Sequence, residues 1–451
     1  MIDAKMARDN IEKLRKSIEL RKVDSSKADV DRWIKLDASR RKLQGQIDIL
    51  NSEKKELAKL GKEDPDAARS KGKELRERSR ELERSLDLVS AEWQQIFDWF
   101  PNWPDPCMPI GQGEEENVEE KVWIPDAGYL CDEKIGIGDR SVSNMPSKPI
   151  HSEIEFDATH HSELGSNLGD IDTLQASKVS GSRFAYLRGD VAKLQYTISR
   201  LLIDELFRRD YEMFIPPLLV RERALYGTSH FPEGRDQVYA ISSDNVEDGN
   251  QLFLVGSSEP TNFSYFSDKT FASDSLPHKV FAYTPCFRSE AGSWGKDVKG
   301  IKRVHQFDKI EMNAICLPDQ SESVYQEFSE INEWLLQKLR LPYRIVDKCT
   351  GDAGYLASFR QKDLEVWLSG SGEYMEVMTD TNTTDYQARR LGIRYRAEKI
   401  RGFCHTVNDT GAAMGRLIIA ILDNYQQKDG SVLIPEILQE SIGKTHLVPN
   451  L

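Results

Sequence analysis

The stretch that decides the fold is TPCFRSEAGSWGKDVKGIKRVHQFDKIEM, residues 284–312, in which a basic loop with three glycines joins two strand-like runs. The first run ends in FRSE (287–290), and the second returns through His305 to Glu311. An arginine at a strand end suits a phosphate or a carboxylate, because its planar fork donates two parallel hydrogen bonds. A bare Phe-Arg-x-Glu pattern also occurs in ordinary charged hairpins, so this stretch alone does not decide the function.

The segments around this hairpin predict an α+β fold built on an antiparallel sheet. An amphipathic helix at Asp190–Arg208 runs into YEMFIPPLLV (211–220), whose two prolines suit an edge or interface strand. Gly411–Gln427 is expected to form a further apolar helix. The other strand candidates are Gln251–Val255, His278–Phe287, Lys302–Ala314, Tyr343–Val346, Leu364–Leu368 and Glu373–Met378. Most of them are separated by turns instead of helices, which disfavours a doubly wound parallel sheet.

The first hundred residues carry two heptad series of apolar residues. The first series is Leu36, Leu43, Leu50 and Leu57, and the second is Leu75, Leu82, Val89 and Ile96. Between them lies GKEDPDAARSKG (61–72), which is rich in residues that break helices. Two heptad runs with such a break predict an antiparallel helical hairpin at about 30–99. A longer parallel dimer of helices would not need Pro65 at its middle.

The predicted hairpin has a basic middle. Residues 40–84 hold 14 Lys and Arg against 10 Asp and Glu, whereas the whole chain has a net charge of -13. One interpretation is a solvated coiled-coil face, and the other is an arm that lies along a nucleic-acid backbone. The basic residues that the second interpretation uses are Lys54, Lys55, Lys59, Arg69, Lys73, Arg76 and Arg80.

Composition and breaker residues suggest the compartment and the domains. The six cysteines form no CxxC pair, so we expect no zinc site and no disulfide framework. The N-terminus lacks an apolar signal region, and no apolar run approaches the ~18 residues of a membrane span, so we expect a cytosolic protein without a membrane partner. The proline-rich run FPNWPDPCMPIGQG (100–113) marks a boundary. We expect a hairpin domain at 1–105, a linker and insertion at 106–177, and a catalytic domain at 178–451.

Taken together, these segments resemble the class II aminoacyl-tRNA synthetases, and within them the bacterial-type seryl-tRNA synthetases. FRSEAGSWGKDVKGIKRVHQFDKIE is similar to motif 2 of that class, and residues 407–438 are similar to motif 3. The helix followed by YEMFIPPLLV is similar to motif 1, which builds the dimer interface in the class. KVSGSRF (178–184) and TGDAGY with DLEVWL (350–368) also match the family, and the heptad hairpin stands where the family has its tRNA-binding arm.

The resemblance implies an activity, its substrates and its partners. The protein would activate L-serine with ATP to seryl-adenylate, release pyrophosphate, and transfer serine to the 3′ end of tRNA(Ser). The resemblance does not decide whether tRNA(Sec) is a second acceptor. It further implies Mg²⁺ as cofactor, a homodimer, a cytoplasmic location and no binding of DNA.

The resemblance also implies roles for individual residues. Arg288 would contact the α-phosphate of ATP and the serine carboxylate, and Arg416 would reach the γ-phosphate. The implied catalytic residues are Arg288, Glu290 and Arg416. The implied ATP-binding residues are Arg288, Glu290, Arg303, Val304, Phe307, Glu376, Thr379 and Arg416, of which Glu376 and Thr379 would also hold Mg²⁺. The implied serine-binding residues are Ser257, Glu259, Arg288, Glu311, Asn408 and Thr410.

Three departures from the family pattern bear on affinity. Gly256-Ser257 stands where the family has a Pro-Thr pair. Met378–Asp380 stands where the family has small hydroxyl and thiol residues, and Asp380 would add a charge near ATP. The segment at about 124–145 looks partly inserted. Class II enzymes for threonine or proline carry a further C-terminal domain, for which the residues after 427 are too few. A synthetase-like paralogue that only binds ligands is the other alternative, and Arg288, Glu311, Glu376 and Arg416 argue against it.

Overall fold

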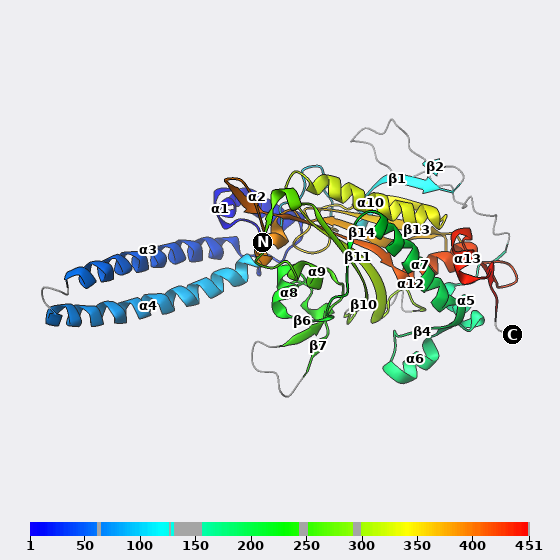
Figure 1. The fold of residues 1–451 in the computed structure, drawn as a ribbon, viewed down its shortest axis with the longest axis horizontal. Coiled ribbons are helices and arrows are strands. Elements are labelled where there is room, and N and C mark those ends of the chain that lie inside the picture. Colours follow the sequence, from blue (N-terminus) through cyan, green and yellow to red (C-terminus); the bar gives the residue numbers. More distant parts are fainter. Residues whose placement is uncertain (61–64, 126–127, 130–155, 243–250, 292–298, 450–451) are drawn as a thin grey trace. The chain divides into compact units, whose positions relative to one another are not determined.

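The structure is a computed structural model that describes residues 1–60, 65–125, 128–129, 156–242, 251–291 and 299–449 (Figure 1). Most of the expected insertion at 124–145 and the tip of the motif 2 loop lie outside the described residues. The chain divides into two compact units, Met1–Trp103 and Pro104–Leu451. In the described part of the chain, no helix is long and apolar enough to cross a membrane.

The first unit is helical and contains the predicted hairpin. Its helices are α1 (Ala4–Asp9), α2 (Ile11–Leu20), α3 (Val30–Leu60) and α4 (Pro65–Phe97). Trp33 near the start of α3 stacks on Phe97 at the end of α4 with ring centroids 5.6 Å apart, so the two helices run antiparallel. Leu50 and Leu75 from the two heptad series are buried between them. The antiparallel hairpin is therefore confirmed.

The break between the two helices is shorter than the sequence predicts. Because α4 begins at Pro65, the last eight of the twelve residues of the expected break, including Gly72, are helical. Proline is tolerated there because the first N–H groups of a helix have no partner within the helix. Gly72 in the helix costs about 1 kcal/mol relative to alanine, which the packing of α3 on α4 offsets.

The second unit is built on a nine-stranded sheet with the order β2-β1-β12-β13-β14-β17-β11-β10-β5. Neighbouring strands are antiparallel except for β5, which pairs in parallel with β10 at the sheet edge. The strands are β1 (Val118–Ile124), β2 (Gly128–Tyr129), β5 (Glu212–Phe214), β10 (His278–Phe287), β11 (Gln306–Cys316), β12 (Tyr343–Asp347), β13 (Arg360–Leu368), β14 (Glu373–Asn382) and β17 (His405–Ala413). The predicted antiparallel α+β architecture is confirmed.

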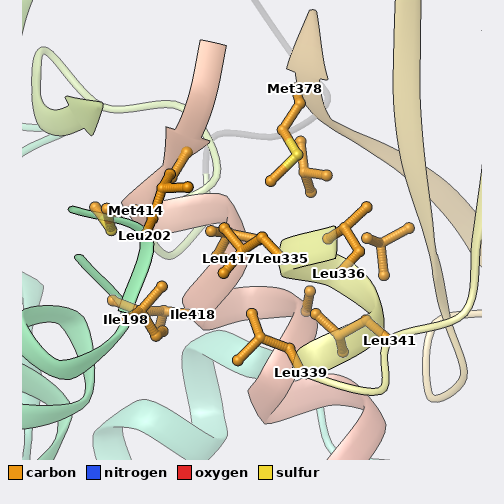
Figure 2. Packing of buried hydrophobic residues seen from close by; sticks show 14 of the residues in the cluster. Ile198, Leu202, Leu335, Leu336, Leu339, Leu341, Met378, Met414, Leu417 and Ile418 are labelled. Atoms are coloured by element: carbon orange, nitrogen blue, oxygen red, sulfur yellow. The ribbon is translucent and has the colours of Figure 1, made fainter. Parts of the chain in front are cut away.

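Three helices pack on one face of this sheet and form the main core with it: α7 (Gly189–Arg208), α10 (Ser321–Lys338) and α12 (Met414–Tyr425). Figure 2 shows Leu335 and Leu336 of α10 beside Leu417 of α12, with Met378 of β14 pointing toward them. All four side chains are buried. These three helices therefore cover one face of the sheet, and the short helices α9 (Glu259–Ser264) and α11 (Tyr386–Leu391) pack on part of the opposite face.

Short elements complete the second unit. The remaining helices are α5 (His161–Leu168), α6 (Thr173–Ser180), α8 (Glu222–Gly227), α9 (Glu259–Ser264), α11 (Tyr386–Leu391) and α13 (Glu436–Ile442), with 3-10 turns at Glu114–Glu116, Arg235–Gln237 and Ser273–Ser275. The small sheets pair β3 (Ile171–Asp172) with β4 (Tyr186–Leu187), and β18 (Val432–Leu433) with β19 (His446–Leu447). In the others, β8 (Leu252–Leu254) lies between β6 (Leu219–Arg221) and β7 (Ala240–Ile241), and β15 (Arg394–Ala397) lies between β9 (Thr270–Ala272) and β16 (Ile400–Phe403).

Several predicted boundaries are wrong, among them those of β13, which begins at Arg360 and not at Leu364, and of β14, which ends at Asn382 and not at Met378. The helix expected at Gly411–Gln427 begins only at Met414, because the residues up to Ala413 belong to the central strand β17. The strand expected from Lys302 begins at Gln306. The run at 211–220 is split into β5 and β6, since its two prolines cannot donate to a sheet ladder. The helix α10 was not predicted at all.

Candidate active site

A cavity of about 360 Å³ opens beside the strands β10, β11, β14 and β17. Eight of the predicted site residues line it, although they come from three separate segments of the sequence. They are Arg288, Glu290, Arg303, Val304, Phe307, Glu376, Thr410 and Arg416. The remaining predicted residues of the second unit lie on the elements next to it.

The register of the sheet explains how these segments meet. Glu311 on β11 lies opposite Thr410 on β17, and Asn313 lies opposite Asn408. Side chains two residues apart on a strand share a face, so this pairing groups Lys309 and Glu311 with the two β17 residues. Gly411 stands at the irregular position between the paired residues of β17, as glycine often does at a bulge.

The cationic part of the cavity is formed by three arginines. Arg288 donates to the carbonyl of Gly256 at 3.3 Å, and its guanidinium lies 5.3 Å from the centre of the Phe307 ring. The guanidinium of Arg303 lies 3.6 Å from the carboxylate of Glu290. Arg416 from α12 donates to the Glu376 carboxylate at 2.9 Å. Such an arrangement suits an extended anion beside a flat aromatic group.

A second part of the site is a buried polar pocket around two glutamates. Glu259 at the start of α9 accepts from Gln387 at 2.6 Å and from Asn408 at 3.2 Å. Glu311 forms an ion pair with Lys309, which also donates to the Thr410 hydroxyl at 3.3 Å. Burial raises the pKa of both carboxyls, and the neighbouring Glu311 helps to raise that of Glu259 to about 8. A small cationic group is the ligand that two such carboxyls would favour.

Glu376 and Thr379 form a pair of oxygen donors at the edge of the cavity. Residues three apart on a regular strand would face opposite sides of the sheet. Here the pairing skips Val377, since Leu364 pairs with Met378 and Glu365 pairs with Glu376. This bulge brings the Thr379 hydroxyl within 3.3 Å of the Glu376 carboxylate.

Sequence reasoning missed four residues of the site. His230 and Tyr355 line the cavity, Lys309 connects Glu311 to Thr410 in the buried polar pocket, and Asp363 accepts from Thr379. Lys309 could have been found, because it precedes Glu311 by two residues on the same strand. His230 and Tyr355 lie on loops far away in the sequence, and no spacing rule connects them to the site.

The comparisons with known proteins cover both units. Residues 1–104 match the family described as the seryl-tRNA synthetase N-terminal domain, and residues 239–425 match the tRNA synthetase class II core domain (G, H, P, S and T). The serine--tRNA ligases of Dictyoglomus turgidum and Rubrobacter xylanophilus are each 36% identical to the chain over 100% of its length, and 100% and 99% of those proteins are covered. The chain belongs to the seryl-tRNA synthetases.

Solved members of this seryl-tRNA synthetase family share the fold. The crystal structure of seryl-tRNA synthetase from Pyrococcus horikoshii complexed with ATP superposes with a TM-score of 0.85, at 32% identity and with 100% of both chains covered. The cytoplasmic serine-tRNA ligase from Naegleria fowleri in complex with AMP superposes with a TM-score of 0.80, at 25% identity, covering 98% of this chain and 96% of that one. The predicted family and fold are thereby confirmed.

One departure from the family pattern lies away from the cavity. We expected Asp380 to add a charge near ATP, but its side chain is fully buried and accepts from Asn332 of α10 at 3.0 Å. The expectation is wrong because Asp380 follows Thr379 on the strand and therefore faces the opposite side of the sheet. Met378 lies on that helix-covered side as well, within the core (Figure 2).

The predicted tRNA-binding residues lie on α3 and α4 of the first unit. Those whose side chains the structure describes are exposed, apart from Lys54, which is half-buried; they are Lys55, Arg69, Lys73, Arg76 and Arg80. Lys59 lies on α3, and its side chain is outside the described part of the structure. The basic residues are therefore positioned on the solvent side of the hairpin, where a polyanion could reach them.

Proposed function

We propose that the cavity between Arg288 and Arg416 is where this protein activates L-serine with ATP, as a serine–tRNA ligase does before it charges tRNA(Ser). The observation that carries the proposal is that arginines from motif 2 and motif 3 line one cavity together with Glu376 and Thr410. The alternative of a paralogue that only binds ligands does not account for this complete set of charged groups in one place.

The reaction needs positioning and charge stabilisation. In the first step the serine carboxylate attacks the α-phosphorus of ATP, and the bond to the leaving pyrophosphate breaks. In the second step the 3′-terminal ribose hydroxyl of the tRNA attacks the carbonyl of seryl-adenylate, and AMP leaves. Neither step requires a covalent bond to the protein, so the protein contributes orientation and fixed positive charge.

ATP would lie along the arginines. Arg288 is placed to bridge the α-phosphate and the serine carboxylate, because its fork can donate to two oxygens at once. Phe307 offers a flat surface for adenine beside Glu290 and Arg303. Arg416 stands at the Glu376 side of the cavity and would contact the γ-phosphate.

Serine would enter the pocket of buried glutamates. Its ammonium group is a small cation that Glu259 and Glu311 can neutralise, with Ser257 and Asn408 beside them. Thr410 is the hydroxyl partner for the serine side chain. An analogue without that hydroxyl would leave the Thr410 partner unpaired, which is how a buried site rejects alanine.

Glu376 and Thr379 fit Mg²⁺, since this ion takes oxygen ligands and the bulge in β14 sets a carboxylate and a hydroxyl side by side. When bound, the ion would supply positive charge to the phosphate oxygens of ATP. The protein's own contribution is to hold these two oxygens together and to keep Arg416 against Glu376.

The basic residues of α3 and α4 would bind tRNA(Ser) through its phosphates. RNA helices offer shape, phosphate and 2′-hydroxyl contacts more readily than base edges, which suits a helical rod. tRNA(Sec) is a second acceptor to include in the same charging assay. We expect this activity in the cytoplasm, where tRNA, serine and ATP occur together.

The protein would act as a homodimer through the motif 1 region. Ile215 between β5 and β6 is 93% exposed, and Leu219 and Phe207 nearby in the sequence are 44% and 50% exposed. Apolar side chains exposed to this extent are what a second copy would cover, and a two-fold dimer is the commonest assembly.

The test is serine-dependent exchange of pyrophosphate into ATP. Arg288→Ala should lower the exchange rate by about 10²–10³, because it removes a positioned donor to developing charge. The matched control is Arg401→Ala, at an exposed arginine of β16 that does not line the cavity. Normal exchange by a folded Arg288→Ala protein would contradict the site.

A further inference from the structure

A chain of polar contacts runs from the edge of the cavity to the loop after β12. The Thr379 hydroxyl donates to one oxygen of Asp363 on β13 at 2.8 Å. The other oxygen of Asp363 accepts from Lys348 at 2.9 Å. Lys348 also lies 3.0 Å from Asp352, which accepts from Asn117 at 2.8 Å. Asp363 is 4% exposed, so its contacts are fixed by packing.

The direction of the Thr379 hydroxyl matters for a cation. A hydroxyl has one proton to donate and two lone pairs to offer, and a metal ion takes a lone pair. If the proton pointed at Glu376, it would occupy the carboxylate oxygen that should face the ion. Asp363 offers the shorter contact, 2.8 Å against 3.3 Å to Glu376. The proton then points away from the site, and the lone pairs point into it.

The ion pair with Lys348 keeps Asp363 in place as an acceptor and prevents it from turning toward the ion. The ammonium group of Lys348 contacts the second carboxylate oxygen of Asp363 and neutralises the charge of that carboxylate. Lys348 is held in turn by Asp352, so the carboxylate is restrained from two sides. Partners of metal ligands that fix ligand orientation in this way typically change metal affinity by 10–100-fold when removed.

We propose that Asp363 is a positioning residue for the ATP-bound divalent cation, with Lys348 as the group that holds it in place. Asp363 accepts a hydrogen bond from the Thr379 hydroxyl, so that Thr379 presents a lone pair and Glu376 a carboxylate oxygen to the same ion. This role rests on the proposed function, since it assumes that Glu376 and Thr379 hold the ion.

The test measures metal binding directly. Mn²⁺ is titrated into the full-length protein with ATP, and the free ion is followed by electron paramagnetic resonance. Asp363→Asn should weaken Mn²⁺ binding by about 10-fold and raise the Mg²⁺ concentration for half-maximal pyrophosphate exchange by the same factor. The KM for serine should stay unchanged. The matched control is Asp347→Asn, a buried aspartate of β12 that pairs with Arg360, and it should bind Mn²⁺ like the wild type.

A double variant separates positioning from ligation. Because Asp363 acts through Thr379, Asp363→Asn should add no further loss to Thr379→Val. Fully additive losses would mean that Asp363 is a ligand in its own right, and the proposal would be overturned. Lys348→Met keeps the carboxylate but removes its anchor, and it should also weaken Mn²⁺ binding; wild-type affinity in a folded Lys348→Met or Asp363→Asn protein overturns the proposal.

The two hypotheses fail in different ways. If Glu376→Gln binds Mn²⁺ with ATP as tightly as the wild type, the proposed metal site itself is wrong. If Glu376→Gln loses the ion while Asp363→Asn keeps it, the metal site stands and only the role of Asp363 is rejected.

Discussion

At the scale of single residues, the Thr410 hydroxyl is the group that would distinguish serine from alanine. It lies opposite Glu311 in the sheet and accepts from Lys309 at 3.3 Å. Thr410→Val keeps the shape of the side chain and removes the hydrogen-bonding oxygen. The serine-to-alanine ratio of kcat/KM should fall about 10-fold, the equivalent of one hydrogen bond. Thr410→Ser should keep the ratio, and an unchanged ratio in the valine variant would show that another group recognises the serine hydroxyl.

His230 lines the cavity, and its imidazole is neutral in the folded protein. It is buried beneath the ring of Tyr355, with ring centroids 4.9 Å apart. Burial first, and then the nearby Arg288 and Lys309, lower its pKa to about 3. The folded protein therefore carries a neutral imidazole where the unfolded chain carries an ordinary histidine.

This difference predicts a loss of stability in acid. Between the folded pKa of about 3 and the unfolded value of 6.5, the unfolded state binds more protons, so the free energy of unfolding rises with pH. The stabilisation that comes from the neutral His230 is fully present above pH 6.5. At pH 5 the loss from His230 should be about 2 kcal/mol. Urea unfolding gives the free energy of unfolding at pH 5 and at pH 8. The difference between these two values should be smaller for His230→Gln than for the wild type. The same difference in wild type and His230→Gln would refute this, and His446→Gln serves as the control.

At the scale of secondary-structure elements, one asparagine on the helix-covered face of the sheet connects β14 and β17, the two strands that carry the site. Asn332 of α10 donates to Asp380 of β14 at 3.0 Å and to Asp409 of β17 at 2.7 Å, and all three side chains are fully buried. These two strands carry Glu376 and Thr379 on one side of the cavity and Thr410 on the other. The contact from α10 therefore fixes the spacing of both halves of the site.

Removing this asparagine should destabilise the protein strongly. Asn332→Ala leaves two buried carboxyl groups without their shared donor, which should cost about 3 kcal/mol. Chemical denaturation measures the change, and Glu330→Ala at an exposed position of the same helix should stay within about 0.5 kcal/mol of the wild type. A cost below 1 kcal/mol for Asn332→Ala would mean that the carboxyl groups find other donors.

Local pattern predicted some of these elements and not others. The strand His278–Phe287 and the helix α7 follow clear apolar periodicities, and their predicted positions are confirmed to within a residue. The strand β17 was missed because HTVNDTGAA mixes polar residues with small ones and matches no simple period. Its identity as a strand depends on pairing with β11 and β14, which are distant in the sequence. Asp363 and His230 escaped prediction for the same reason.

At the scale of the whole molecule, the two units would divide the reaction between them. The cavity belongs to Pro104–Leu451, whereas the basic hairpin residues belong to Met1–Trp103. Amino acid activation and tRNA binding should therefore respond to different substitutions. The charge of the hairpin alone is compatible with a purely structural role. The prediction that the hairpin binds tRNA therefore came from the resemblance to the family.

Charge reversal on the hairpin tests this division. The triple variant Lys73→Glu, Arg76→Glu and Arg80→Glu should lose tRNA charging and keep pyrophosphate exchange, since these residues would contact only tRNA phosphates. The dependence of tRNA affinity on salt should also become shallower, by about one unit of slope for each lost phosphate contact. The charge-conserving variant Lys73→Arg, Arg76→Lys and Arg80→Lys is the control. Normal charging by the reversed variant would favour a purely structural hairpin.

The bulge at Val377 changes the parity of β14. Before it, even-numbered Glu376 faces the cavity, and after it, odd-numbered Thr379 does. Even-numbered Met378 and Asp380 face the helices instead. Deleting the extra residue Val377 would therefore leave the two faces as they are, because Glu376 and Thr379 would then lie two residues apart on a regular strand. A search for ligand pairs at the even spacings of a regular strand would pass over Glu376 and Thr379, because the irregularity itself places them together.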